Sequence, residues 1–160
     1  MTDTGSNEES WLGHTIIQRY YIERELAQGS LFTVYRATDQ ENKRDVALKV
    51  LRIPMTPDRP EAQNWSTDLE QVSQWSHHHF LPVKDIGAQE GTLYIVEPLM
   101  SKSSFFDHLQ ENLISASEAM RLSLQILGAL EALHKVGRYH LNLTPKNLYL
   151  IDNAIGLPQI

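Results

Sequence analysis

Hydrophobic and polar residues alternate along three short segments in the first third of the chain. Residues 21–27, 32–37 and 45–51 are rich in Tyr, Val, Ile and Leu, and stretches that contain Gly, Ser, Asn and Asp separate them. Alternation with a period of two is typical of strands that bury one face. The pattern predicts an antiparallel meander of three strands, preceded by a flexible lead-in over residues 1–13.

A proline-rich stretch after residue 52 interrupts this pattern, and apolar residues with helical spacing follow it over residues 61–75. Two further strands are predicted at residues 81–86 and 93–96, because apolar runs of strand length flank a turn signal there. Residues 14–97 are therefore expected to form one lobe with five strands and one helix.

The C-terminal part of the chain has helical patterns. A short helix is predicted over residues 103–110 and a longer one over residues 115–134, where Ser115 and Glu118 form a capping-box pattern and Gly137 lies just past the end. The large apolar residues of the longer helix cover about 200° of the helical wheel. They are Met120, Leu122, Leu124, Ile126, Leu127, Leu130 and Leu133. Such a helix expects neighbours on two sides, so we expect it to bind a protein partner or a second copy of the chain.

Composition and charge narrow the choice of partner and compartment. The 160 residues carry a formal net charge of −6 without a long Lys/Arg cluster, which argues against nucleic acid or an anionic membrane as the main partner. No apolar run reaches the length of a membrane span, and the polar residues 1–10 do not resemble a signal peptide. The lack of cysteine excludes disulfides and thiol catalysis and is compatible with a reducing cytoplasm, where we expect the protein.

Two motifs far apart in the chain carry the candidate chemistry. The first is Val-Ala-Leu-Lys at 46–49, and the second is His-Leu-Asn-Leu-Thr-Pro-Lys-Asn at 140–147. They resemble the strand V-A-I-K and the catalytic loop H-R-D-x-x-x-x-N of eukaryotic-type Ser/Thr protein kinases, and the order of the other segments is similar to that domain from about residue 20 onward. The resemblance implies an α+β, protein-kinase-like fold. Its N lobe would be a five-stranded antiparallel sheet with one helix, and residues 98–160 would form the hinge and the first helical part of a truncated C lobe.

The resemblance also implies an ATP site with altered positions. Lys49 matches the lysine that contacts ATP phosphates, and Gly29 is the glycine that remains of the Gly-rich loop. The helix glutamate that pairs with this lysine falls on Asp68, with Glu70 as the neighbouring candidate, and the shorter side chain of Asp68 would strain the ion pair. The apolar walls of the pocket match Leu26, Val34, Ala47 and Tyr149.

The hinge-like segment has a charged residue where the back of the pocket is expected. A gap-free match places Glu97 at the gatekeeper position, followed by Pro98, which lacks a backbone N–H donor. A carboxylate in an apolar pocket is costly unless it is paired, and Lys49 is a candidate partner. Phe32 stands where the Gly-rich loop has a glycine, and its bulk argues against the usual close approach to phosphates.

The catalytic-loop motif departs from the family at the positions that do the chemistry. The family has an aspartate that accepts the substrate proton, a lysine that stabilises the phosphoryl group and an asparagine that binds magnesium. Here these positions hold Asn142, Thr144 and Asn147. A carboxamide cannot accept the proton, so general-base help worth about 10²–10⁴-fold is lost. Asn147 keeps the magnesium position, but no D-F-G sequence occurs up to Ile160, so a complete magnesium site is not expected.

These departures favour a kinase-like module that transfers no phosphate, in other words a pseudokinase that retains weak ATP binding and acts by protein interaction. A second hypothesis is that the chain is the front part of an ATP-dependent Ser/Thr protein kinase, with the remaining residues encoded elsewhere or lost by truncation. A third is a scaffold that binds no nucleotide, because Phe32, Glu97 and Tyr149 would crowd the pocket. The sequence leaves all three open.

Overall fold

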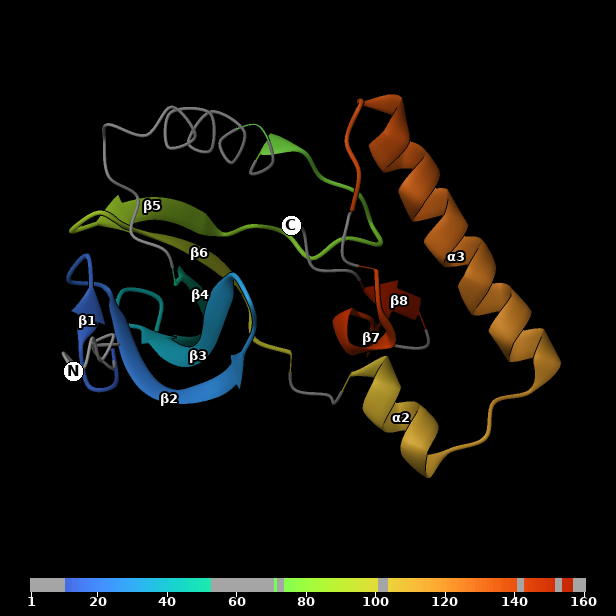
Figure 1. Cartoon of the computed structure of the whole chain (residues 1–160), viewed down its shortest axis with the longest axis horizontal. Helices are drawn as coiled ribbons and strands as arrows, with labels where there is room; N and C mark the ends of the chain where they lie inside the picture. The colour runs from blue at the N-terminus through green and yellow to red at the C-terminus, as the bar shows by residue number, and fades with distance from the viewer. Residues whose placement is uncertain are drawn as a thin grey trace, which may run out of the picture.

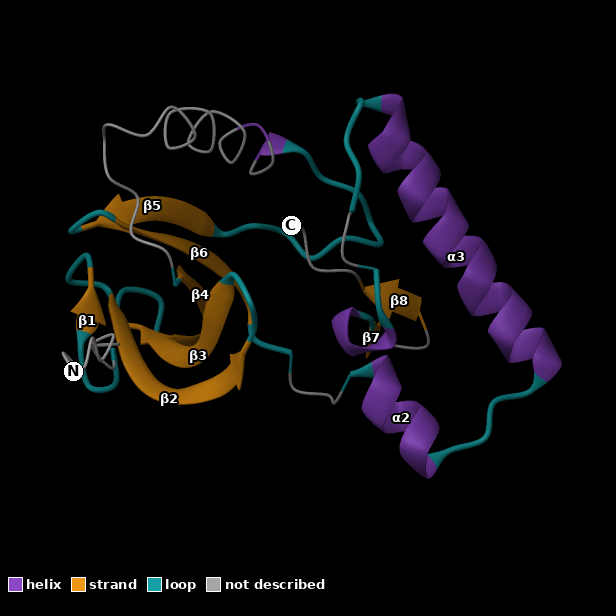
Figure 2. Ribbon diagram, in the orientation of Figure 1, coloured by secondary structure: helices purple, strands orange, loops and turns teal. Residues whose placement is uncertain are grey.

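The structure consists of a β-sheet formed by the first part of the chain and a helical part that follows it (Figures 1 and 2). This order confirms the predicted α+β class. The computed structural model describes residues 11–52, 71, 74–100, 104–140, 143–151 and 154–156. The predicted helix at 61–75, and with it Asp68 and Glu70, lies largely outside these residues.

The sheet has six antiparallel strands in the order β1-β2-β3-β4-β6-β5. Their bounds are Thr15–Ile16 for β1, Tyr20–Gln28 for β2, Phe32–Asp39 for β3, Arg44–Leu51 for β4, Asp85–Gln89 for β5 and Thr92–Pro98 for β6. The five predicted strands are present, and β1 is a sixth that the sequence analysis did not predict, because two residues are too few for a periodic signal.

The fourth predicted strand is displaced along the chain. It was expected at residues 81–86 and lies at Asp85–Gln89 instead. Pro82 has no N–H to donate to a neighbouring strand, which disfavours a strand through this position. The apolar residues around it pack as a connection: Leu81 is buried.

Alternation along the strands gives the sheet two different faces. Tyr35 and Ala37 of β3 lie opposite Leu48 and Val46 of β4, and all four belong to the largest buried cluster. The opposite face of β4 carries Lys49. A smaller buried cluster lies on that second face and consists of Leu51, Leu93 and Ile95, with Phe32 packed against it.

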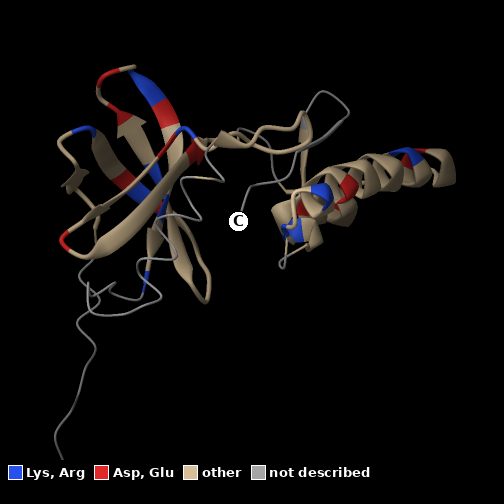
Figure 3. Ribbon diagram, turned by 90° about the horizontal axis from the view of Figure 1, so that it is seen from above, with Lys and Arg blue, Asp and Glu red and all other residues tan. Residues whose placement is uncertain are grey.

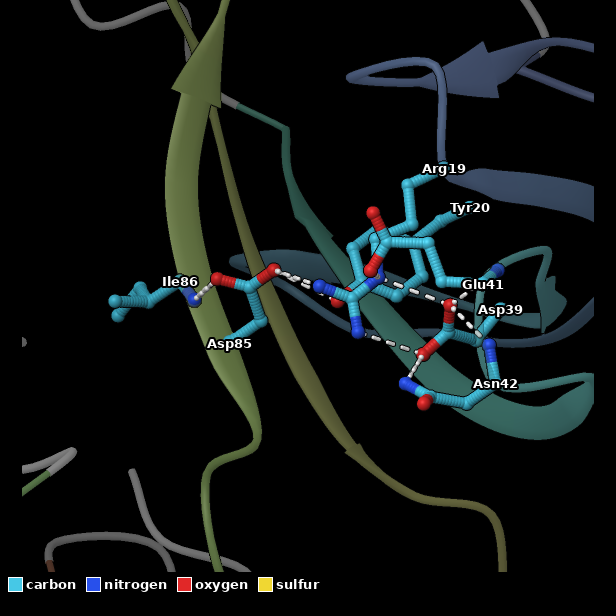
Figure 4. Close-up of polar contacts among 7 residues, drawn as sticks. All are labelled: Arg19, Tyr20, Asp39, Glu41, Asn42, Asp85 and Ile86. Atoms are coloured by element: carbon cyan, nitrogen blue, oxygen red, sulfur yellow. Dashed lines mark hydrogen bonds and ion pairs between the residues drawn. The ribbon is translucent and has the colours of Figure 1, made fainter.

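A polar network ties together the ends of strands that are not all neighbours in the sheet (Figure 4). The buried Asp39 accepts hydrogen bonds from Arg19, 2.9 Å from Nε and 2.8 Å from Nη2, and another at 2.7 Å from Asn42 Nδ2. Arg19 also lies 3.7 Å from Asp85, which accepts a 2.7 Å hydrogen bond from the Tyr20 hydroxyl. The Arg19 guanidinium holds the pKa of Asp39 well below its usual range. The network therefore connects β2, the end of β3 and the start of β5.

Helix α2 spans Phe105–Glu111, close to the predicted position. The Ser104 hydroxyl accepts from the Asp107 N–H at 3.3 Å, and the Asp107 carboxylate accepts from the Ser104 N–H at 3.0 Å. This capping box satisfies two N–H groups that the first turn leaves without helical partners. The Phe105 N–H donates to the Leu148 carbonyl at 2.7 Å and so attaches α2 to the C-terminal segment.

Helix α3 spans Ala116–Lys135, again as predicted. At its start the Ser115 hydroxyl accepts from the Glu118 N–H at 3.2 Å. At its end Gly137 has a φ of +72° and donates to the His134 carbonyl at 2.9 Å. A positive φ is easily adopted by glycine, which explains the helix stop at this residue.

The broad apolar arc of α3 is divided into a covered side and an exposed side. The covered side contributes Leu122 and Ala129 to a buried cluster, with Ile126 and Leu133 packed against it. We call the exposed side the α3 stripe; its residues are Met120, Leu124 and Leu127, which are 67%, 64% and 61% exposed. The helix thus has the broad apolar surface that the helical wheel predicts. Within the part of the chain that the structure describes, one side of this surface is covered and the other is exposed.

The remaining elements are small. A 3₁₀ turn, η1, spans Pro145–Asn147, and strands β7 (Tyr149–Ile151) and β8 (Ala154–Gly156) pair as an antiparallel hairpin. No helix of the described ranges combines the length and apolarity that crossing a membrane requires.

Candidate functional site

Lys49 lies on β4, on the sheet face opposite the main buried cluster. Its cross-strand neighbours are Val34 on β3 and Ile95 on β6, and Ala47 lies opposite Glu97. Side chains of directly opposed residues point to the same side of a sheet. The register therefore places Val34, Ala47, Lys49 and Glu97 on one face, which brings three of the predicted site residues together with the gatekeeper carboxylate.

Lys49 and Glu97 form a buried ion pair. The Lys49 Nζ atom lies 2.8 Å from Glu97 Oε2, and the two side chains are 15% and 3% exposed. Burial raises the pKa of the Glu97 carboxyl group, and Lys49 opposes that rise. The second oxygen, Glu97 Oε1, is buried and accepts no hydrogen bond from the described residues. Lys49 is thus the partner that makes this carboxylate tolerable, as its sequence position suggests.

Tyr149, a predicted wall residue, lies on strand β7 and is half-buried. Burial raises the pKa of the Tyr149 phenol, and the negative charges of Glu97 and Asp107 raise it further.

The loop that corresponds to the Gly-rich loop is a closed hairpin turn. The Gly29 N–H donates to the Phe32 carbonyl at 2.8 Å, so this donor is used inside the turn. The Gly29 carbonyl accepts from Arg52 Nη1 at 3.0 Å, and the Leu31 carbonyl accepts from the Arg52 N–H at 2.8 Å. A Cβ atom at Gly29 would come within 3.2 Å of the Phe32 oxygen, which explains the glycine by close packing of the turn.

Leu26 lies at an irregularity of the sheet. The register between β2 and β3 steps from Glu25 opposite Tyr35 to Ala27 opposite Val34, so Leu26 is the extra residue of a β-bulge. Its side chain is 39% exposed. The register does not assign this predicted wall residue to the face that holds Lys49.

The catalytic-loop segment is described in part. Thr144 is exposed, and Asn147, at the end of η1, is half-buried with its N–H donating to the Thr144 carbonyl at 2.9 Å. The His140 side chain is buried, and its ring centroid lies 6.1 Å from that of Phe80. Asn142 falls outside the described residues, as Asp68 does. The roles assigned to these two residues stay predictions.

The side chains on this sheet face can be compared separately with the base, the phosphates and the magnesium ion of a bound ATP. Val34 and Ala47 offer half-buried, uncharged surface of the kind that a base packs against. The Gly29 N–H is used within its turn, whereas Lys49 uses one of the three N–H donors of its ammonium on Glu97. Among the described residues no group of three or more His, Cys, Asp or Glu side chains could hold a metal ion, and Asn147 is the one predicted magnesium ligand there. The described residues of the site thus supply uncharged surface that suits a base and one lysine that could meet a phosphate.

Arg52 is the residue of this site that sequence reasoning missed. It follows Lys49 by three positions and belongs to no motif. Phe32 pairs with Leu51 across β3 and β4, and this register brings Arg52 to the carbonyls of the loop. Only the paired hairpin reveals the contact, because the sequence does not encode the register in a recognisable pattern.

In a comparison with protein-family models, the model described as protein kinase domain matches residues 20–157. Similar curated proteins include NUAK family SNF1-like kinase 1 of Homo sapiens, 27% identical over 142 residues, and the serine/threonine-protein kinase PrkC of Bacillus subtilis, 27% identical over 143 residues. These alignments cover 88% and 89% of this chain and 22% of each relative. The chain thus spans about a fifth of the length of these relatives.

Solved structures share the same fold. The PknI kinase domain of M. tuberculosis superimposes with a TM-score of 0.77 at 23% identity, covering 94% of this chain and 61% of that one. Rad53 1–466, crystallised in complex with AMP-PNP, gives a TM-score of 0.76 at 18% identity and covers 88% of this chain and 38% of that one. At these identities the likeness establishes the arrangement of strands and helices.

Proposed function

The chain belongs to the protein kinase domain family, and from this premise we propose that it is a kinase-like binding module that transfers no phosphate. The observation that carries the proposal is Asn142, which occupies the position of the catalytic aspartate. A carboxamide can orient a hydroxyl group but cannot take its proton, which forfeits about 10²–10⁴-fold in rate. Thr144 stands at the lysine position, is exposed and brings no positive charge to the phosphoryl group.

The proposal includes weak nucleotide binding through the base. Val34 and Ala47 supply uncharged surface beside Lys49, and Rad53, a structural relative, was crystallised with AMP-PNP. Lys49 keeps two N–H donors beside its contact with Glu97, and these could face a phosphate. Binding would depend little on magnesium, since Asn147 alone is a weak ligand set for an ion that demands near-octahedral oxygen coordination.

The proposal also includes protein interaction through the α3 stripe, with a second copy of the chain as the partner. Met120, Leu124 and Leu127 recur at i, i+4 and i+7, the spacing with which one helix packs along another. Beside the stripe lies a depression of about 350 Å³ lined by the His77, His78 and His79 side chains, Leu124 and Gly128, among others. Exposed apolar surface of this kind favours association. We place the protein in the cytoplasm, which suits a chain without cysteine.

A second candidate function is the front part of an ATP-dependent Ser/Thr protein kinase. The relatives carry that activity in their names, and the chain spans 61% of the PknI kinase-domain chain. In that case carboxylates from another segment would complete the magnesium and catalytic sites. A third candidate is a scaffold without nucleotide, which the buried Lys49–Glu97 pair on the sheet face of the site favours.

Thermal unfolding with ATP, in the presence of magnesium and in the presence of a chelator, separates the three candidates. Ligand at ten times its dissociation constant stabilises the folded state by about 1.4 kcal/mol. The proposed module should show such a shift in both conditions. A shift that requires magnesium would favour the kinase fragment, and the absence of any shift at saturating ATP would leave the scaffold.

A further inference from the structure

We propose that Glu97 selects the base of a bound nucleotide. Its Oε1 atom, the oxygen that Lys49 does not contact, accepts a hydrogen bond from an amino group on the base, so the site prefers adenine. The inference rests on the proposed nucleotide binding and adds the class of base. It assigns to Glu97 a role in specificity that is separate from its ion pair with Lys49.

The first step concerns the two carboxylate oxygens of Glu97. Oε2 lies 2.8 Å from Lys49 Nζ, and the Glu97 side chain is 3% exposed. Oε1 is buried as well, and no residue in the described ranges donates a hydrogen bond to it. Buried polar atoms of folded proteins nearly always have a partner, because an acceptor without one loses the hydrogen bonds it made to water. A donor on a ligand would therefore satisfy Oε1.

The second step concerns the surface beside this oxygen. Glu97 lies directly opposite Ala47, and Lys49 lies directly opposite Val34. Directly opposed side chains point to the same side of a sheet, so the carboxylate shares its face with the half-buried Val34 and Ala47. A planar base that packs on these two residues brings the polar groups of its edge to the carboxylate.

The third step concerns which base edge suits a single acceptor. An ionised carboxylate accepts hydrogen bonds and donates none, and the Lys49 ammonium at 2.8 Å favours this form. The next residue, Pro98, has no backbone N–H to donate. The amino group of adenine supplies one donor, whereas an oxo group at that ring position supplies only a second acceptor. Guanine presents two adjacent donors, which suit a carboxylate with both oxygens available, and here Lys49 occupies one of them.

Calorimetric titration of the unmodified chain tests the preference with three triphosphates that share the same sugar and phosphates. ATP carries the amino group, purine riboside triphosphate has hydrogen in its place, and inosine triphosphate has an oxo group. ATP should bind about tenfold or more tighter than either analogue, as expected for a hydrogen bond to a charged acceptor. Equal affinities would overturn the inference and leave nucleotide binding intact. If none of the three binds, the nucleotide-binding part of the proposed function fails, and the inference fails with it.

Glu97→Gln gives a test that a purely structural role of Glu97 would not pass. The ammonium of Lys49 has only donors, so it keeps the amide oxygen of the glutamine as its partner. The amide N–H₂ then takes the place of Oε1 and offers donors. ATP should lose its advantage over purine riboside triphosphate to within about threefold, and inosine triphosphate should bind more tightly than ATP. A folded Glu97→Gln protein that keeps the original order of affinities would overturn the inference.

Two further variants control the comparison. Glu111→Gln makes the same change at an exposed position at the end of α2 and should keep the preference for ATP within twofold of its original value. Lys49→Met combined with Glu97→Leu removes both charges together, so no buried charge is left without a partner, and the three triphosphates should then bind within about threefold of one another. Circular dichroism verifies the folding of each variant. A tenfold preference for ATP over purine riboside triphosphate in the folded double variant would overturn the inference.

Discussion

A carboxylate that leaves water needs compensation from charges or hydrogen bonds, and this chain compensates two of them very differently. Asp39 accepts bonds from a guanidinium, an amide side chain and the backbone N–H of Glu41 (Figure 4). Glu97 has one ammonium on one oxygen. Accordingly the pKa of Asp39 is lowered, chiefly by Arg19, while that of Glu97 is raised, chiefly by burial. Ionisation of Asp39 therefore stabilises the fold, whereas burial opposes ionisation of Glu97.

Asp39→Asn should weaken the fold and flatten its response to acid. The folded-state pKa lies below the ordinary value of 3.8. The ionised group therefore stabilises the fold fully above that ordinary value, and the stabilisation is lost progressively as the pH falls from there through the folded-state pKa. Urea unfolding at neutral pH should show a loss of about 2–3 kcal/mol, and the variant should lose less stability than the parent between about pH 5 and pH 3.

Asp45→Asn is the matched control, because Asp45 pairs with Arg36 at an exposed position. Its cost should stay below about 1 kcal/mol. Equal costs for the two variants would contradict the assignment of the Asp39 network as a buried, cooperative structure.

The ion pair of the site should behave as a coupled unit. Lys49→Met leaves Glu97 buried without its cation and should cost about 3–5 kcal/mol of unfolding free energy. Adding Glu97→Leu removes the buried charge and should recover most of that loss. Denaturant titration of the four proteins gives the coupling energy; single costs that simply add would contradict the buried pair.

At the residue scale, the sequence predicted the site residues that belong to motifs. It did not predict the contacts that depend on how the strands pair. The matches to V-A-I-K and to the gatekeeper position made Lys49 and Glu97 candidates for one another. Neither Arg52 on the loop carbonyls nor Arg19 on Asp39 belongs to a motif. Both contacts depend on which strand residues lie opposite each other, and the chain gives no local signal for that register.

At the scale of elements, capping and turn residues predicted most of the structure. Ser115 begins α3 and Gly137 ends it, because the hydroxyl satisfies a first-turn N–H and the glycine accepts a positive φ. Strand propensity was less successful where the position of a strand depends on its partner. Strand β1, with two residues, was not predicted, and β5 begins four residues after the start of the strand predicted at 81–86. Strand ends depend on partners, so the sequence locates them less well than helix ends.

Two glycines of the α3 region should respond to alanine with opposite signs. Gly128 lies inside the helix, and a Cβ there would meet no atom within 4 Å, so Gly128→Ala should add about 0.5–1 kcal/mol of stability. Gly137→Ala should remove about 1 kcal/mol, because alanine is strained at a φ of +72°. Thermal unfolding of the two variants checks this, and a shift in the same direction for both would contradict the proposed helix stop.

At the scale of the whole molecule, charge and apolar surface are distributed unequally. Figure 3 shows acidic and basic positions interspersed over the strands, while α3 has long uncharged stretches. The α3 stripe occupies part of that uncharged surface. The helical wheel predicted an apolar arc too wide for one neighbouring element. It could not predict which half of the arc is covered, because that depends on packing against Phe80 and Leu148, which lie outside the helix.

The α3 stripe should make the chain self-associate. Light scattering across a concentration series should show a mass above that of the 18.3 kDa monomer, and Leu124→Glu should reduce it by placing a charge at the contact. Leu113→Glu introduces the same change at an exposed leucine before α3 and should leave the mass unaltered. A strictly monomeric parent protein that binds no hydrophobic dye would contradict the proposal.

Transfer of labelled phosphate from ATP tests the central claim most directly. The purified chain, with magnesium and generic protein substrates, should incorporate no more label into itself or the substrates than Lys49→Ala does, because Asn142 cannot accept the substrate proton. Incorporation by the parent chain that Lys49→Ala abolishes would contradict the account.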